Sequence, residues 1–352
     1  MAEKPDQPRW KRWLRRCLFL ALTLAIARVI VGLVGAIDWG TVREGIGHLA
    51  LWQLPVLIGA IIVRQVFNAW PLAIFIDGLG LPRAVANDQV SIMMYTIAPP
   101  PSHIVVRVAM FKSWGIEVSR ALAGVVMNTL TFFIARWYAP VIGFLLVLYD
   151  RFDQALGWAA LISGAAAAGL LIVVRIIASG DHAAQWVGRS AGRVAQRVRS
   201  SVEPDVWAGS VSQLRGHVLT KLRTGLPQSL LALLVMMLCD AVVLVLAVRF
   251  VGVSSEAIPI VEIVAAYMVT YPLTMGPLFG IGIFDAAALA VMVAYAGVAY
   301  ESYLVAALVV WRIASVGTPL ALGALSMLLW RRLGPPAVLA ESEHIPRTDS
   351  GQ

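Results

Sequence analysis

The sequence has little charge, few cysteines and few histidines. Charged residues make up 14% of the 352 residues, 59% are hydrophobic, and the mean hydropathy is +0.80. Soluble domains carry roughly 25% charged residues, so a water-soluble enzyme and a disordered chain are both excluded. The two cysteines, Cys17 and Cys239, lie in separate apolar runs, which indicates neither a disulfide framework nor a zinc site.

Sequence motifs of catalysis are also lacking. The chain has no phosphate-binding Gly-rich loop of the P-loop kind, no His cluster with metal-ligand spacing and no Gly-x-Ser-x-Gly elbow. We therefore expect no catalytic residue, no metal site and no cofactor, and a transporter is a better expectation than an enzyme.

Apolar runs long enough to cross a membrane are what the chain has instead. A helix needs about 20 apolar residues to span a hydrocarbon core of about 30 Å. We predict six full crossings, over residues 17–37, 49–76, 121–149, 157–178, 227–251 and 303–330. The first run follows basic residues as a signal peptide does, but it is long and lacks a small-residue cleavage site, so we interpret it as an anchor.

The net charge of +8 is concentrated in connections between these runs. Basic residues precede the first run within 1–16, fill the connection 179–226, and follow the last run within 331–352. Lys and Arg mark the cytoplasmic side of membrane proteins, so we expect a cytoplasmic-membrane protein with both termini in the cytoplasm, and no nucleic-acid partner. The membrane halves would then be residues 17–178 and 227–330.

Two apolar segments are broken at their centres. Residues 84–115 are interrupted by Pro99, Pro100 and Pro101, and residues 257–299 by Pro272, Gly276, Pro277, Gly280 and Gly282. Three consecutive prolines cannot continue a helix, and the second segment is broken at its middle in the same way, so each arm is short for a full crossing. Counting the crossings shows that the two segments enter the membrane from opposite faces. This predicts two re-entrant hairpins that belong to an inverted repeat. The alternative is that each hairpin is a pair of short full crossings.

The connection 179–226 has the pattern of two basic amphipathic helices, separated at Pro204. Such helices lie on the inner leaflet and attract anionic headgroups by about 1 kcal/mol per basic residue. The alternative is a solvated linker that only fixes the topology.

Several charged residues fall within or near the apolar runs. Each costs roughly 2.5–3.5 kcal/mol at a helix centre, so we expect them to face a bundle interior or a wet cavity. They are Arg28, Arg64, Arg107, Arg136, Arg312, Asp240, Glu262 and Asp285. Arginines outnumber acids, which favours an anionic ligand, and the guanidinium fork suits phosphate.

Not all of these charges receive the same interpretation. We select Arg107 and Arg312 to engage a phosphate headgroup, with Asp285 balancing and orienting Arg312. Further substrate-binding candidates are Arg64, Asp240 and His103, the one histidine near a candidate site. We expect Arg28 and Arg136 instead to snorkel or to bond a backbone carbonyl.

The sequence resembles the transmembrane region of lysylphosphatidylglycerol synthases, a flippase-like membrane family with stand-alone members. The segment 280–285, Gly-Ile-Gly-Ile-Phe-Asp, is similar to the family's Gly-Leu-Gly-Val-x-Glu, with Asp for Glu. Arg312, Pro319 and Gly323 match the next helix in kind and spacing. In the first half, Pro99 and Arg107 keep the family's separation, but His103 and Ile104 occupy its Gly-Glu positions.

The resemblance implies a re-entrant-hairpin membrane fold and the movement of a lipid between leaflets. We therefore expect a translocase for an anionic phospholipid or lipid phosphate. Two alternatives are a membrane-embedded transferase acting on a lipid or polyprenyl phosphate, and a scaffold for a cell-envelope enzyme. Besides lipids, a homo-oligomer or that separate enzyme is a candidate partner.

Overall fold

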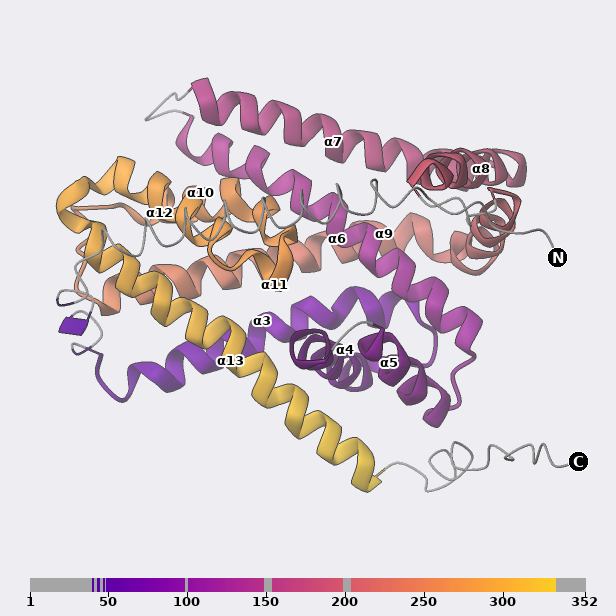
Figure 1. Ribbon diagram of the computed structural model, residues 1–352, viewed down its shortest axis with the longest axis horizontal. Coiled ribbons are helices and arrows are strands. Elements are labelled where there is room, and N and C mark those ends of the chain that lie inside the picture. The colour runs from indigo at the N-terminus through magenta and orange to yellow at the C-terminus, as the bar shows by residue number, and fades with distance from the viewer. Residues whose placement is uncertain are drawn as a thin grey trace, which may run out of the picture.

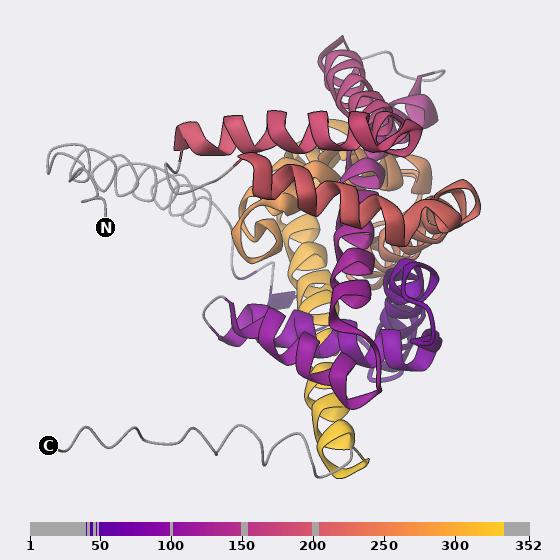
Figure 2. The same ribbon diagram turned by 90° about the vertical axis from the view of Figure 1, so that its right-hand side faces the viewer.

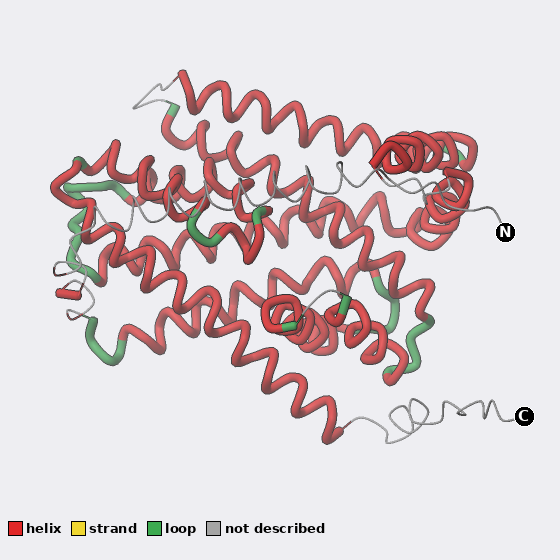
Figure 3. Tube along the Cα trace, viewed as in Figure 1, coloured by secondary structure: helices red, strands yellow, loops and turns green. Residues whose placement is uncertain are grey.

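A computed structural model of the chain describes residues 40, 43–44, 47, 49–98, 101–148, 154–198 and 204–333. Within these ranges every regular element is a helix, as Figure 3 shows, and the elements are joined by short loops. The predicted crossing over residues 17–37 lies outside the described residues, as do Cys17, Arg28, Pro99 and Pro100.

Five helices of the described part are long and apolar enough to cross a membrane. They correspond to five of the six predicted crossings, and the chain is a polytopic helical membrane bundle (Figure 1). The five are α3 (Gln53–Phe75), α6 (Val118–Val147), α7 (Gln154–Ser179), the Thr224–Phe250 part of α9 (Pro204–Phe250), and α13 (Glu301–Leu333), whose candidate span is Val298–Arg332.

The two broken segments form short helices that meet at irregular turns. The first gives α4 (Gly80–Ile97) and α5 (Ser102–Ser113). The second gives α10 (Ile260–Thr270), the 3-10 helix η1 (Tyr271–Met275), α11 (Pro277–Gly280), α12 (Ile283–Ala296) and the 3-10 helix η2 (Val298–Tyr300). None of the four arms α4, α5, α10 and α12 is among the five candidate spans, so the predicted interruptions are confirmed.

The glycines of the second turn have a conformational reason to be there. Gly280 and Gly282 have φ angles of 72° and 85°, in the left-handed region that glycine adopts without steric cost. A Cβ at Gly280 would also clash with the carbonyl oxygen of Leu273. The turn between η1 and α12 therefore depends on glycine at both positions.

The helix contacts repeat between the two halves of the chain. The elements α3, α4, α5 and α6 correspond to α9, α10, α12 and α13, and every contact within the first set has a counterpart in the second. Contacts between the halves follow the same rule, since α4 packs on α13 as α10 packs on α6. Because α3 runs opposite to α9, and α6 opposite to α13 (Figure 1), the pattern is that of an inverted-topology repeat.

The amphipathic connection differs from the prediction in one respect. The first predicted helix is α8 (Asp181–Val198), but the second is continuous with the membrane span, and together they form α9. α8 and the first part of α9 lie side by side across one end of the bundle (Figure 2). Pro227 lies inside α9 without ending it, and proline is a usual cause of a bend where a helix changes direction.

Close packing at two glycines holds the interrupted helices against the long ones. A Cβ at Gly143 of α6 would lie 2.9 Å from the carbonyl oxygen of Ala265 in α10. A Cβ at Gly323 of α13 would lie 2.6 Å from the carbonyl oxygen of Gln89 in α4. Small residues allow helix backbones to approach this closely in membranes.

We expect Gly323→Ala to destabilise the protein by about 1–3 kcal/mol, because the added methyl forces α13 away from α4. The matched control is Gly317→Ala on the same helix, where a Cβ would meet no atom within 4 Å. That substitution should be neutral or stabilise by up to about 1 kcal/mol through helix propensity. Thermal unfolding in detergent measures both, and equal melting temperatures would contradict the packing argument.

Candidate functional site

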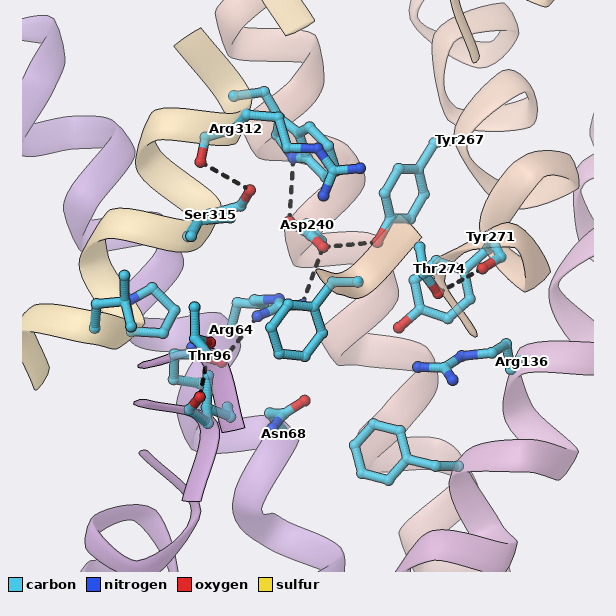
Figure 4. Close-up of a pocket in the computed structure, with 18 residues that line it drawn as sticks. Arg64, Asn68, Thr96, Arg136, Asp240, Tyr267, Tyr271, Thr274, Arg312 and Ser315 are labelled. Atoms are coloured by element: carbon cyan, nitrogen blue, oxygen red, sulfur yellow. Dashed lines mark hydrogen bonds and ion pairs between the residues drawn. The ribbon is translucent and has the colours of Figure 1, made fainter. Parts of the chain in front are cut away.

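A polar pocket lies where the two halves of the repeat meet. Its volume is about 190 Å³, and its walls come from α3, α4 and α6 of the first half and from α9, α10, η1, α11 and α13 of the second. Figure 4 shows the polar side chains pointing toward one another across it: Arg64, Asn68, Thr96, Arg136, Asp240, Tyr267, Tyr271, Thr274, Arg312 and Ser315. Backbone that departs from a continuous α-helix is tolerated at membrane depth where it is covered by protein or lines a cavity. Here the short elements η1 and α11 line the pocket.

Asp240 is the carboxylate of the pocket wall, and its side chain is 3% exposed. Its Oδ2 lies 3.2 Å from Arg64 Nη2 and accepts a 2.7 Å hydrogen bond from the Tyr267 hydroxyl. Its Oδ1 accepts a 3.2 Å hydrogen bond from Trp311 Nε1. Because these three partners come from different helices, Asp240 connects α3, α9, α10 and α13.

Arg312 is held by a second carboxylate, Asp285 of α12. Arg312 Nε donates to Asp285 Oδ1 at 2.7 Å, while Asp285 Oδ2 accepts from the backbone N–H of Gly282 at 2.8 Å. The guanidinium also stacks on Trp311, 4.7 Å from the ring centroid. Asp285 therefore holds both Arg312 and the start of α12. The contact with Arg312 is the one expected from the sequence, whereas the contact with Gly282 was not predicted.

Arg136 is the arginine of the pocket that has no carboxylate partner among the described residues. Its guanidinium carbon lies 5.6 Å from the centroid of the Tyr271 ring. The role expected from the sequence, snorkelling or bonding a carbonyl, is corrected here, because the side chain lines the pocket. Three arginines and two aspartates, Asp240 and Asp285, leave the site with one surplus positive charge.

The buried side-chain atoms of the pocket that have no hydrogen-bond partner are donors. Buried and without a hydrogen-bond partner are Arg64 Nε, Arg136 Nε and Arg312 Nη2, one atom on each pocket arginine. No acceptor of a pocket-lining side chain is among the unpartnered buried atoms of the described residues. Buried donors are normally paired, so these three atoms are available to a water or to a ligand that accepts hydrogen bonds.

Arg107 and His103 do not line this pocket. Arg107 donates from Nε to Asn87 Oδ1 at 2.7 Å, and its Nη2 lies 3.2 Å from Asp88 Oδ1. His103 packs edge-on against Tyr95, 5.5 Å between ring centroids. The structure therefore brings Arg64, Asp240 and Arg312 to one pocket, but not Arg107, which we had expected beside Arg312. A polar bridge links the two sites, since Asn68 of the pocket donates to Asp88 at 2.6 Å.

The structure describes some of the residues that were predicted to form the hairpin tips. Pro101 precedes α5, Gly276 lies between η1 and α11, and Pro277 begins α11. Phe279, beside Gly280, lines the pocket and has a positive φ of 60°. Among the described residues, no group of three His, Cys, Asp or Glu could hold a metal ion.

Residues missed from the sequence are mostly uncharged. Tyr267, Tyr271, Thr274 and Ser315 line the pocket, but single hydroxyls within apolar runs give no signal of their own. Arg136 is detectable in the sequence as a charged residue in the middle of a predicted crossing. The sequence does not show which helix faces it, so a structural role and a role in the pocket cannot be told apart from the sequence alone.

Comparison with known proteins shows which family the chain belongs to. The family described as "Lysylphosphatidylglycerol synthase TM region" matches residues 18–323 of the chain. The chain belongs to this family. No curated protein and no solved structure matches it. As a member of the lysylphosphatidylglycerol synthase TM family with five described candidate spans, the chain is a multi-pass membrane protein related to membrane lipids.

Proposed function

We propose that this protein is a flippase-like translocase that moves a lipid with a phosphate in its headgroup between the leaflets of the cytoplasmic membrane. The observation that carries this proposal is the set of three arginines that each present a buried, unpartnered N–H at one pocket. A phosphate offers several acceptor oxygens and a negative charge, and it satisfies donors and surplus charge together.

The architecture around the pocket supports movement as well as binding. Transporters place the substrate site between inverted repeats and build it from discontinuous helices. Here the pocket lies between the two halves, and η1 and α11 of the second interrupted segment contribute to its wall. The basic helix α8, with Arg189 and Arg193 exposed, fits the cytoplasmic surface.

In this mechanism each arginine has a separate role. Arg136 offers its charge to the phosphate without first leaving a carboxylate. Arg312 is oriented by Asp285 and contributes Nη2, while Arg64 contributes Nε and stays paired with Asp240. The headgroup would thus cross the membrane through a buried pocket in which arginine side chains neutralise the phosphate charge. This lowers the free-energy cost of moving the charge through the hydrocarbon core.

Reconstitution into vesicles with a fluorescent phospholipid in one leaflet tests the proposal. We expect wild-type protein to accelerate exchange of the probe relative to protein-free vesicles. Asp285→Ala should slow it by about tenfold, because Arg312 loses the bond that orients it. Correctly folded wild-type protein that moves no lipid would overturn the proposed function, and an Asp285→Ala rate equal to wild type would remove Asp285 from it.

A further inference from the structure

The membrane helix α7 has no counterpart in the repeat among the described elements. It precedes α9 in the chain and packs mainly on α6, with smaller contacts to α9 and α10. By the correspondence between the halves, its counterpart should precede α3 and pack mainly on α13, with smaller contacts to α3 and α4. The predicted crossing over residues 17–37 precedes α3. The repeat therefore predicts that this segment lies against α13.

An apolar groove is present on α13 where such a segment would lie. The groove is formed by α3 and α13, and its volume is about 730 Å³. None of its lining residues is charged, and Thr318 is the one that carries a hydroxyl. Leu49 also lines the groove, and residues 38–48 connect the predicted crossing to Leu49. The chain thus leads from this groove directly to residues 17–37.

The surface of α6 that matches the groove is the one that α7 covers. Gly143 of α6 and Gly323 of α13 are equivalent, because each packs on the first interrupted helix of the other half. Val141 and Ala321 precede these two glycines at the same spacing, so their positions are equivalent as well. A Cβ at Gly164 of α7 would lie 3.1 Å from Val141 Cγ2, whereas Ala321 is exposed and lines the groove. The face of α6 that α7 covers is therefore open on α13 in the described part of the chain.

The sequence of residues 17–37 suits an apolar groove. Leu22, Ile26, Val29 and Leu33 recur at helical spacing, which predicts one bulky apolar ridge. Arg28, the charged residue of the segment, falls outside this ridge, so its charge need not enter the groove. The family match begins at residue 18, so the family's membrane region includes this segment.

We infer that residues 17–37 pack in the groove between α3 and α13 and complete the repeat. Each half then has four membrane elements. The first half has residues 17–37, α3, the first hairpin and α6, and the second has α7, α9, the second hairpin and α13. Because α3 and α13 also line the polar pocket, the docked segment holds two of the pocket walls in place. The inference concerns the assembly of the fold and does not rest on the proposed function.

A photoreactive amino acid in the groove tests this inference in the full-length protein. Leu325 of α13 lines the groove and is 52% exposed, so a p-benzoylphenylalanine side chain can replace it without entering the core. The purified protein is illuminated in lipid nanodiscs and digested, and the adducts are located by mass spectrometry. We expect most adducts to join Leu325 to peptides from residues 17–37.

Two control positions carry the same probe. At Phe144 of α6 it should react with α7, because a Cβ at Gly157 of α7 would lie 3.5 Å from the Phe144 ring. At Ile172, which is 57% exposed on α7, it should react with lipid. Adducts at position 325 that leave out residues 17–37, whether with lipid, with α3 or with a second copy of the chain, would overturn the inference. So would the lack of any adduct there while position 144 reacts with α7. Since this readout does not involve lipid movement, its failure leaves the proposed function standing.

Discussion

Asp240→Asn is expected to lower the free energy of unfolding by about 3 kcal/mol. The substitution leaves the Arg64 guanidinium in a site where its side chain is 17% exposed and has lost its counter-charge. Breaking a buried ion pair from one side typically costs about 3–5 kcal/mol. We expect the lower end of that range, because Arg64 keeps its 2.9 Å hydrogen bond to Gln65. Thermal or denaturant unfolding in detergent measures the change.

A second variant separates charge from hydrogen bonding at this position. When Arg64→Gln is combined with Asp240→Asn, both charges are gone, while the introduced amide still offers a carbonyl oxygen to the Tyr267 hydroxyl or the Trp311 N–H. We expect the double variant to recover most of the lost stability, as buried pairs often tolerate joint replacement by neutral groups. A double variant as unstable as the single one would show that the Tyr267 and Trp311 hydrogen bonds carry the stabilisation instead.

The expected recovery matters for the function because Arg64 and Asp240 join the two halves of the repeat. The other two ion pairs of this region stay within one half: Arg107 with Asp88 in the first, and Arg312 with Asp285 in the second. A stable double variant would therefore allow the effect of the inter-half pair on lipid movement to be measured in folded protein.

The sequence predicts the bundle well because its signals are local. Five apolar runs of span length recur as helices, and the prolines and glycines of residues 84–115 and 257–299 interrupt helices where expected. Proline removes a backbone donor wherever it stands, and clustered prolines and glycines break a helix. Single prolines do not end the long helices, since Pro71, Pro140, Pro227 and Pro319 lie inside α3, α6, α9 and α13.

The site is less predictable because it depends on which helices face each other. The pairing of Asp285 with Arg312 follows from matching charges on neighbouring helices of the chain. The pairing of Arg64 with Asp240 joins residues far apart in the sequence, and it requires the contact between α3 and α9. Arg107 was expected beside Arg312, but in the structure Arg107 pairs with Asp88, which lies on the other arm of the same hairpin.

Arg136→Gln is expected to weaken binding of a phospholipid headgroup by about 10- to 100-fold without destabilising the fold. Arg136 is the pocket arginine without a carboxylate partner among the described residues, and its Nε is buried and unpartnered. Losing a hydrogen bond to a charged group costs about 1.5–3 kcal/mol in binding, which corresponds to that range. The free energy of unfolding should stay constant or rise, because a buried surplus charge has been removed.

The variants Asp240→Asn and Arg136→Gln are expected to affect two different measured quantities, stability and lipid binding. Asp240→Asn should lower stability, whereas Arg136→Gln should lower binding alone, although both residues line the same pocket. Retention of phosphatidylglycerol during purification measures binding, and thermal unfolding measures stability. Arg175→Gln is the matched control, since Arg175 lies exposed on the membrane helix α7. If Arg136→Gln and Arg175→Gln retained lipid equally, Arg136 would not hold the phosphate, and the pocket's surplus charge would need another explanation.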